Sequence, residues 1–347
     1  MASPPPLGLT TYRWNNNLKS GALLVAFPVL LMALAFAILW GYALVNTGPD
    51  RLVDPRTFDD LGLGTRLGGH YSPTEFALAA LSVLWLPILL VALAWVAIGY
   101  AFHDGMIRLA TGAQPIERSA APELYNLLET LCISRGLEMP RLYVMDSDAL
   151  NAFASGLGRR TYAITVTRGL VESLTRDELE AVLGHELTHI INRDVRLLIV
   201  TVVFVGMISF IAQMLWRTLQ FGGTGSDRRK TNPIVIVAAI AMGVGYLLAL
   251  VLRFALSRTR EYLADAGSVA LTKNPEALIS ALRKIAGHAE LPDVPTEVRQ
   301  MFIENPPTAA ALFGLFATHP PVEARIRVLE QLAGLPPHGH SIIPNAG

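Results

Sequence analysis

The chain has 347 residues, of which 52% are hydrophobic and only 16% are charged, a balance that excludes a mainly disordered protein. Lysine and arginine together number 28, as do aspartate and glutamate, so a formal net charge of zero gives no electrostatic argument for a nucleic-acid partner. The single cysteine, Cys132, excludes an internal disulfide and a multi-cysteine metal cluster, so any metal must be held by histidines and carboxylates.

Most of the apolar residues fall in four stretches, and each is long enough to cross a hydrocarbon core of about 30 Å as a helix. The stretches predict four transmembrane helices, at residues 21–45, 76–102, 197–216 and 233–256. The first stretch is too long for the core of a cleavable signal peptide, so we interpret it as an uncleaved anchor. For the last two, a buried hairpin of soluble helices is the alternative.

The apolar stretches divide the chain into six parts. In order, these are an N-terminal tail without regular structure (1–20), a first transmembrane hairpin (21–102) with a non-cytoplasmic loop (46–75), a polar segment (103–196), a second transmembrane hairpin (197–256), a second polar segment (257–333) and a flexible tail (334–347). Lysine and arginine are slightly more frequent, nine against seven, at the span ends that adjoin the N-terminal tail and the two polar segments than in the two opposing loops. This places both polar segments in the cytoplasm.

In the first polar segment, apolar residues recur with helical spacing over 169–194. Thr175 followed by Glu178 is a capping box, so we expect a helix to begin near residue 176. That helix carries His185-Glu186-Leu187-Thr188-His189, an H-E-x-x-H pattern. Its two histidines lie one turn apart on one face and can bind one Zn²⁺, with Glu186 beside that face. The alternative is a chance pentapeptide on a solvated helix.

A catalytic zinc site needs a third protein ligand and an open position. Glu261 is the candidate, because it follows the fourth apolar stretch in a segment without proline or glycine until Gly267 and hence expected to be helical. Asp265, four residues further on, lies on the same face and is placed to accept a hydrogen bond from a zinc-binding histidine. An even number of spans must then separate residues 190 and 260, and hydropathy gives two.

With these motifs the sequence resembles the HtpX-type membrane metalloproteases, which are zinc endopeptidases related to the CAAX prenyl endopeptidases. The matching blocks, in the family's order, are Asn151–Gly156, Gly184–His189, Asn192–Asp194, Ser257–Asp265 and Phe316–Pro321. The resemblance extends over about residues 15 to 335 of the chain. The departures are a proline-rich start, a long loop between the first two spans and Ala317 in place of a frequent serine, and none touches a ligand position.

The resemblance implies an α-helical integral membrane protein with four transmembrane helices and a mainly α, zincin-like (gluzincin) protease domain that contains a small β-sheet. It also implies one Zn²⁺ per chain, held by His185, His189 and Glu261, with Glu186 as the general base. The spacing of the residues had led to the same four. Cys132, on an expected helix over 119–135, is interpreted as a packing residue.

Two further sites are expected. The family implies that Asn151, Ala152, Phe153 and Ala154 belong to an edge strand that binds an extended substrate through its backbone, and an ordinary hairpin is the alternative. His319 is expected near the metal as a donor to the oxyanion, unless it only precedes the Pro320-Pro321 helix start.

The sequence therefore predicts a zinc-dependent membrane endopeptidase that acts on misfolded or damaged membrane proteins, in a bacterial-type inner membrane with its active site on the cytoplasmic side. A CAAX-type prenyl endopeptidase is an alternative that the number of spans disfavours. A non-catalytic, metal-stabilised scaffold is a second, disfavoured because Glu186 is present. A metal transporter would need ionisable residues within the spans, and these spans have almost none.

Overall fold

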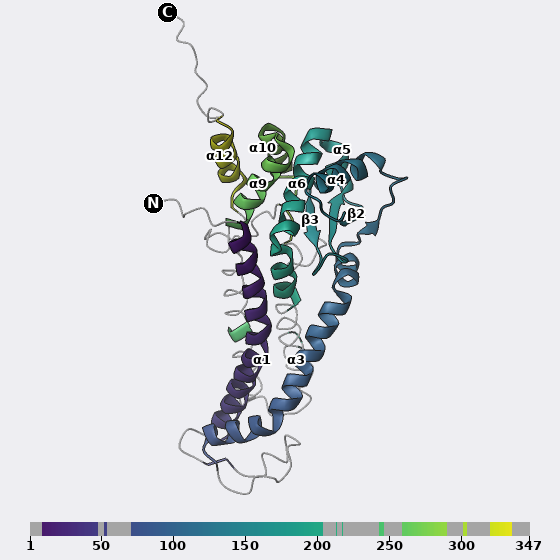
Figure 1. The fold of residues 1–347 in the computed structure, drawn as a ribbon. Helices are drawn as coiled ribbons and strands as arrows, with labels where there is room; N and C mark the ends of the chain where they lie inside the picture. The colour runs from purple at the N-terminus through teal and green to yellow at the C-terminus, as the bar shows by residue number, and fades with distance from the viewer. Residues whose placement is uncertain are drawn as a thin grey trace, which may run out of the picture. The chain divides into compact units, whose positions relative to one another are not determined.

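The structure is a computed structural model, and it describes residues 9–47, 52–53, 71–203, 213, 217, 243–245, 259–289, 301–303 and 320–334. The described chain is mostly helical with one small mixed sheet (Figure 1). It divides into two compact units. One comprises Met1–Leu18, Phe102–Ile199 and Arg253–Gly347, and the other comprises Lys19–Ala101 and Val200–Leu252.

Two long helices, α1 (Leu9–Thr47) and α3 (Pro73–Thr111), account for the first two apolar stretches. Their apolar spans are Asn15–Leu44 and Pro73–Thr111, and both are long and apolar enough to cross a membrane. Each contains a proline in its interior, which membrane helices tolerate. The third and fourth expected spans lie largely outside the described residues.

The prediction that residues 1–20 lack regular structure is wrong from residue 9 onward, because α1 begins at Leu9. Its first turns contain three consecutive asparagines, which have a low intrinsic preference for helix. A tertiary contact offsets this preference: Asn16 is buried, and its side-chain amide donates a hydrogen bond of 3.2 Å to the carbonyl of Asn192.

The end of α1 packs against the start of α3. Leu39 and Ala43 form a buried apolar cluster with Phe76, Ala77 and neighbouring side chains. The start of α3 is fixed by a capping box, in which the backbone N–H of Ser72 donates to Glu75 at 2.9 Å and the N–H of Glu75 donates to the Ser72 hydroxyl at 3.3 Å.

The sheet has the strand order β1-β2-β4-β3, with β1 (Gln114–Pro115), β2 (Arg141–Met145), β3 (Ala152–Ser155) and β4 (Ala163–Thr167). The β2–β4 pair is parallel, whereas the β1–β2 and β3–β4 pairs are antiparallel. The small β-sheet that the resemblance implied is confirmed. All residues of β3 and β4 are buried, and β3 is the last strand at one end of the sheet.

Three helices lie next to these strands along the chain. The helix α4 (Pro122–Ser134) lies between β1 and β2, and α5 (Arg168–Ser173) and α6 (Arg176–Asn192) follow β4. Both bonds of the capping box between Thr175 and Glu178 are present, so the expected start of α6 is confirmed. Glu178 also accepts hydrogen bonds from Ser280 and Lys284 of α10 (Pro275–Ile285), at 2.6 and 2.7 Å. Burial alone raises the pKa of Glu178, but these hydrogen bonds lower it to about 2.

The sequence places α9 (Thr259–Thr272) more than sixty residues after α6, yet the two helices pack at very close range. Gly267 of α9 faces Thr188 of α6 so closely that a Cβ on the glycine would lie 2.3 Å from Thr188 Cγ2. Beside this point, the Ser268 hydroxyl donates a 2.6 Å hydrogen bond to the carbonyl of Ala181. The last described helix, α12 (Val322–Ala333), packs on α9 and α10.

We predict that Gly267→Ala lowers the free energy of unfolding by about 1–3 kcal/mol, the usual cost of overpacking a core. The Thr188 side chain cannot easily turn away, because its hydroxyl donates a 2.8 Å hydrogen bond to the Gly184 carbonyl. Thermal unfolding of the detergent-purified protein measures the effect. Gly105→Ala is the matched control, since no atom lies within 4 Å of the new Cβ in helix α3.

The double variant Gly267→Ala/Thr188→Ala removes the atoms that meet the new Cβ most closely. It should recover most of the lost stability. An unfolding temperature as low as that of Gly267→Ala alone would contradict a direct clash between the two helices.

Candidate metal centre

Three side chains from α6 and α9 meet at one point. Nε2 of His185 and Nε2 of His189 lie 3.1 Å apart, and Oε2 of Glu261 lies 3.6 and 3.8 Å from these two nitrogens. Donor atoms at about 2.0–2.1 Å from a tetrahedral zinc ion are about 3.3 Å from one another. Within the described residues, this is the one group of three histidine, cysteine or carboxylate side chains close enough to share an ion.

His185 is fixed by a buried carboxylate. Its Nδ1 lies 2.9 Å from Oδ1 of Asp265, so Nδ1 carries the proton and Nε2 is left as the metal donor. Asp265 is in turn held by Arg325 of α12, whose Nε and Nη2 donate to the two carboxylate oxygens at 2.9 and 2.6 Å. Burial alone raises the pKa of Asp265, but the charge and hydrogen bonds of Arg325 lower it below its ordinary value.

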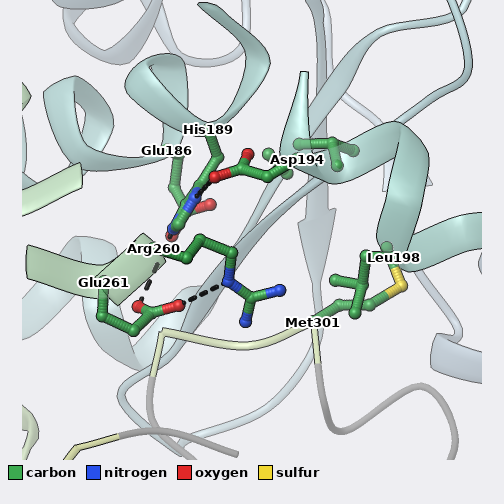
Figure 2. A pocket seen from close by; sticks show the side chains of 9 residues that line it. Glu186, His189, Asp194, Leu198, Arg260, Glu261 and Met301 are labelled. Carbon is green, nitrogen blue, oxygen red and sulfur yellow. Dashed lines mark hydrogen bonds and ion pairs between the residues drawn. The ribbon is translucent and has the colours of Figure 1, made fainter. Parts of the chain in front are cut away.

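His189 has its own carboxylate partner, Asp194, at 3.1 Å from Nδ1 (Figure 2). Asp194 is almost completely buried. It reaches the ring because α6 ends at Asn192 and the next residue, Arg193, adopts the left-handed backbone conformation with φ 60°. That turn brings the chain back beside the last turn of the helix. Each of the two histidines thus has one ring nitrogen bound to a carboxylate and the other free for an ion.

The third donor is oriented by its neighbour in sequence. Nε of Arg260 donates a 2.8 Å hydrogen bond to Oε1 of Glu261 (Figure 2). Oε2 is the oxygen that lies 3.6 and 3.8 Å from Nε2 of His185 and His189. Both side chains are buried.

Glu186 lies beside the three donors and lines the same small cavity as His189 and Glu261. Neither of its carboxylate oxygens has a hydrogen-bond partner within the described residues, although the side chain is only 1% exposed. Burial raises the pKa of Glu186 above its ordinary value. A buried carboxylate of this kind needs a partner beyond the described residues, such as a water molecule or an ion.

The cavity has a volume of about 10 Å³. This is about the room that a single water molecule needs. Together with the donor spacing and the unsatisfied carboxylate of Glu186, it fits a small cation with one additional oxygen ligand.

The predicted substrate-binding strand is β3, the end strand that packs against α6. Ala154 lines the metal cavity. Ala152 offers its carbonyl at this edge, but it already accepts a 2.8 Å hydrogen bond from the backbone of Ile303. Phe153 packs on Phe302 with ring centroids 4.6 Å apart.

Asn151 has a structural position in the described chain. The side-chain N–H of Asn151 donates to the carbonyl of Ala289 at 3.0 Å, and its side-chain oxygen Oδ1 accepts from the backbone N–H of Ala152 at 3.0 Å. Cys132 is buried in α4 as a packing residue, and burial raises its pKa to about 11. His319, the expected oxyanion donor, lies outside the described residues.

Three residues of the site were not predicted from the sequence. Asp194 had been noted only as part of a matching block, because the bond to His189 depends on the left-handed turn at Arg193 and not on helical spacing. Arg325 follows His185 by 140 residues, so only the packing of α12 brings it to Asp265. For Arg260, adjacency to Glu261 was the only available signal.

Comparisons with known proteins show the family of the chain. The sequence pattern of peptidase family M48 matches residues 118–333. A protein from Bacteroides fragilis described as a "Protease HtpX homolog" is 42% identical over 335 residues, which cover 94% of this chain and 99% of that protein. Another of the same description, from Nostoc punctiforme, is 37% identical over 91% of this chain and 96% of its own length. The crystal structure of S. mikatae Ste24p has a TM-score of 0.45 at 20% identity, over 89% of this chain and 67% of that one.

We predict that Asp265→Asn weakens metal binding about 10- to 100-fold, as is usual when the partner of a metal-binding histidine is lost. The asparagine keeps the shape of the side chain but loses the charge that both His185 and Arg325 contact. Metal content after dialysis against graded chelator concentrations measures this effect. Asp148→Asn, at an exposed loop position, is the control and should keep the wild-type metal content.

We also predict that metal affinity rises with pH. Burial alone lowers the pKa of His185, but Asp265 and Glu261 raise it to about 9 in the metal-free protein. Metal binding must displace this proton, so between pH 6 and 8 the affinity should rise about tenfold per pH unit. Competition with a chromophoric chelator measures the slope. A pH-independent affinity would show that His185 is already neutral before the metal binds.

Proposed function

Because the chain belongs to peptidase family M48, whose pattern matches most of it, we propose that it is a zinc-dependent membrane endopeptidase with its ion held by His185, His189 and Glu261. The chain is a metalloendopeptidase by its family and by its relatives. The identity of the metal and the roles of the residues are our assignment. The observation that carries it is the spacing of the three donor atoms, 3.1, 3.6 and 3.8 Å.

Two imidazole nitrogens and one carboxylate oxygen suit Zn²⁺, and such a set leaves a fourth position for water or substrate. When bound, zinc would lower the pKa of water and polarise the carbonyl of the peptide to be cut. Asp265 and Asp194 support this role, because each keeps one histidine in the tautomer that leaves Nε2 free.

Glu186 is assigned as the general base and then the general acid. Its raised pKa and its unsatisfied oxygens suit a group that takes up a proton from water and returns it to the leaving amine. From the sequence alone, we assign His319 as a donor to the oxyanion.

The substrate is proposed to be an extended polypeptide that adds to the edge of β3 at Ala152, Phe153 and Ala154, where it would replace the hydrogen bond that the Ala152 carbonyl accepts from the backbone of Ile303. Main-chain pairing of this kind gives affinity with little side-chain selectivity, which suits misfolded or damaged membrane proteins. Since Asn151 is engaged within the protein, we assign it the role of positioning the strand.

For the membrane, we propose that residues 197–216 and 233–256 add two spans to α1 and α3. The lysine and arginine pattern then places the site on the cytoplasmic side of a bacterial inner membrane. In that arrangement the two parts of the zinc site lie before and after the second transmembrane hairpin, which suits substrates that reach it from the bilayer.

We predict that Glu186→Gln retains about one zinc per chain but loses about 10²–10⁴-fold in the rate of cleavage of an unfolded protein, because the group that moves the proton is gone. Zinc content and cleavage are measured on the same detergent-purified preparation. Glu180→Gln on the same helix is the control. It should retain both zinc and activity.

The two readouts separate the possible failures. Cleavage by Glu186→Gln at the wild-type rate would contradict the general-base assignment. A wild type that holds zinc but cuts nothing would contradict the proposed peptidase role of this site, and a wild type without zinc would contradict the ligand set.

A further inference from the structure

A second cavity lies on the other side of α6. Leu187 and Ile191, which line it, each stand two positions after a metal-binding histidine and therefore point away from the metal. The cavity has a volume of about 320 Å³. Its walls come from the end of α6, the turn that follows it, the loop between β3 and β4, and the residues after α4.

Three arginines line this cavity, Arg159, Arg193 and Arg196, and Glu138 is the one acidic residue among the lining side chains. Over the ranges that the structure describes, none of the three guanidiniums forms a hydrogen bond or an ion pair. The arginines of the metal centre differ in this respect, since Arg260 and Arg325 are both paired with carboxylates. The second cavity therefore has positive charge that the described protein does not neutralise.

The charges of the three guanidiniums all act on the hydroxyl of Tyr162. Burial raises the pKa of the Tyr162 hydroxyl, the charges of Arg193, Arg196 and Arg159 act to lower it, and the opposing charge of Asp194 acts to raise it. Tyr162 and the three arginines all line the cavity. Guanidinium groups gathered around a common space favour an anion with several acceptor oxygens, and phosphate is the common biological one.

Apolar side chains also line the cavity, among them Leu157, Leu187 and Ile190. A free inorganic anion would not need such a surface. The volume is at the lower end of the range of about 300–1,000 Å³ for small-molecule sites. It suits a charged headgroup with the first methylenes of an attached chain.

The position in the chain gives the source of such a ligand. Arg193 and Arg196 immediately precede the apolar stretch 197–216, which we propose to enter the membrane. Basic residues at this point of a membrane protein meet the anionic headgroups of the cytoplasmic leaflet.

We propose that this cavity binds the phosphate ester of an anionic phospholipid, with the phosphate on Arg159, Arg193 and Arg196 and the first acyl methylenes on Leu187 and Ile190. The inference rests on the membrane placement proposed above and not on the zinc assignment. A soluble phosphate ester has the same charged group. The apolar walls and the adjoining apolar stretch favour the lipid.

The test is binding of short-chain lipids to the full-length, detergent-purified protein. The probes are dihexanoyl phosphatidylglycerol, dihexanoyl phosphatidylcholine and glycerol 3-phosphate, each titrated below its micellar concentration. Phosphatidylglycerol should bind saturably and at least tenfold more tightly than the other two. Arg159→Gln and Arg196→Gln should each weaken it about fivefold.

Two further variants sharpen the result. Arg193→Asn removes the guanidinium, and asparagine tolerates the left-handed backbone at this position, so binding should weaken without loss of the turn. Arg160→Gln changes the neighbouring arginine, which like Arg159 is exposed but does not line the cavity, and should leave the affinity unchanged. Unfolding temperature and zinc content of each variant show that it remains folded.

Unchanged phosphatidylglycerol affinity in the Arg159→Gln/Arg196→Gln double variant would overturn the site. Equal affinity for phosphatidylcholine would overturn recognition of an anion. Equal affinity for glycerol 3-phosphate would overturn the lipid as its source. None of these outcomes depends on peptide cleavage, so a protein that binds the lipid but cuts no substrate would contradict only the proposed function.

Discussion

The close packing of α6 on α9 is the constraint on which the metal centre depends. Two donors come from one helix and the third from the other, so their mutual distances are only as well defined as the contact between the helices. Gly267 permits this contact, because any side chain there would meet Thr188. Ser268 then ties α9 to the backbone of α6 by a hydrogen bond. The site thus needs a glycine in the middle of a helix, a position where glycine has an intrinsic cost of about 1 kcal/mol.

The centre also gathers many charges away from water. Glu186, Glu261, Asp265 and Arg325 are all nearly completely buried. Burying a charge has a large desolvation cost, which is offset only by good geometry and full hydrogen bonding. Arg325 meets this requirement for Asp265 by a two-point contact and also donates to the carbonyl of Ile303 at 3.0 Å. Within the described residues Glu186 has no such partner, which suits the role of general base that we propose for it.

What the sequence could predict was local in character. The capping box at Thr175 and the helical spacing of His185 and His189 follow from patterns a few residues long. Glu261 was within reach because its helix repeats the same spacing with Asp265. The failures have a common physical origin in tertiary contacts. Asn16 is helical because it contacts Asn192, and Arg325 belongs to the site because α12 packs on α9.

The turn at Arg193 has a mechanical consequence. Residues 194–203 are helical and begin at Asp194, the residue that holds the ring of His189. One residue in the left-handed conformation is thus the joint between the metal helix and a segment that runs into the apolar stretch 197–216. A tilt of that segment would move Asp194 and, through its contact with Nδ1, the imidazole ring of His189. Under the membrane placement proposed above, a change in bilayer thickness that tilts this segment would be transmitted to His189 through a hinge of one residue.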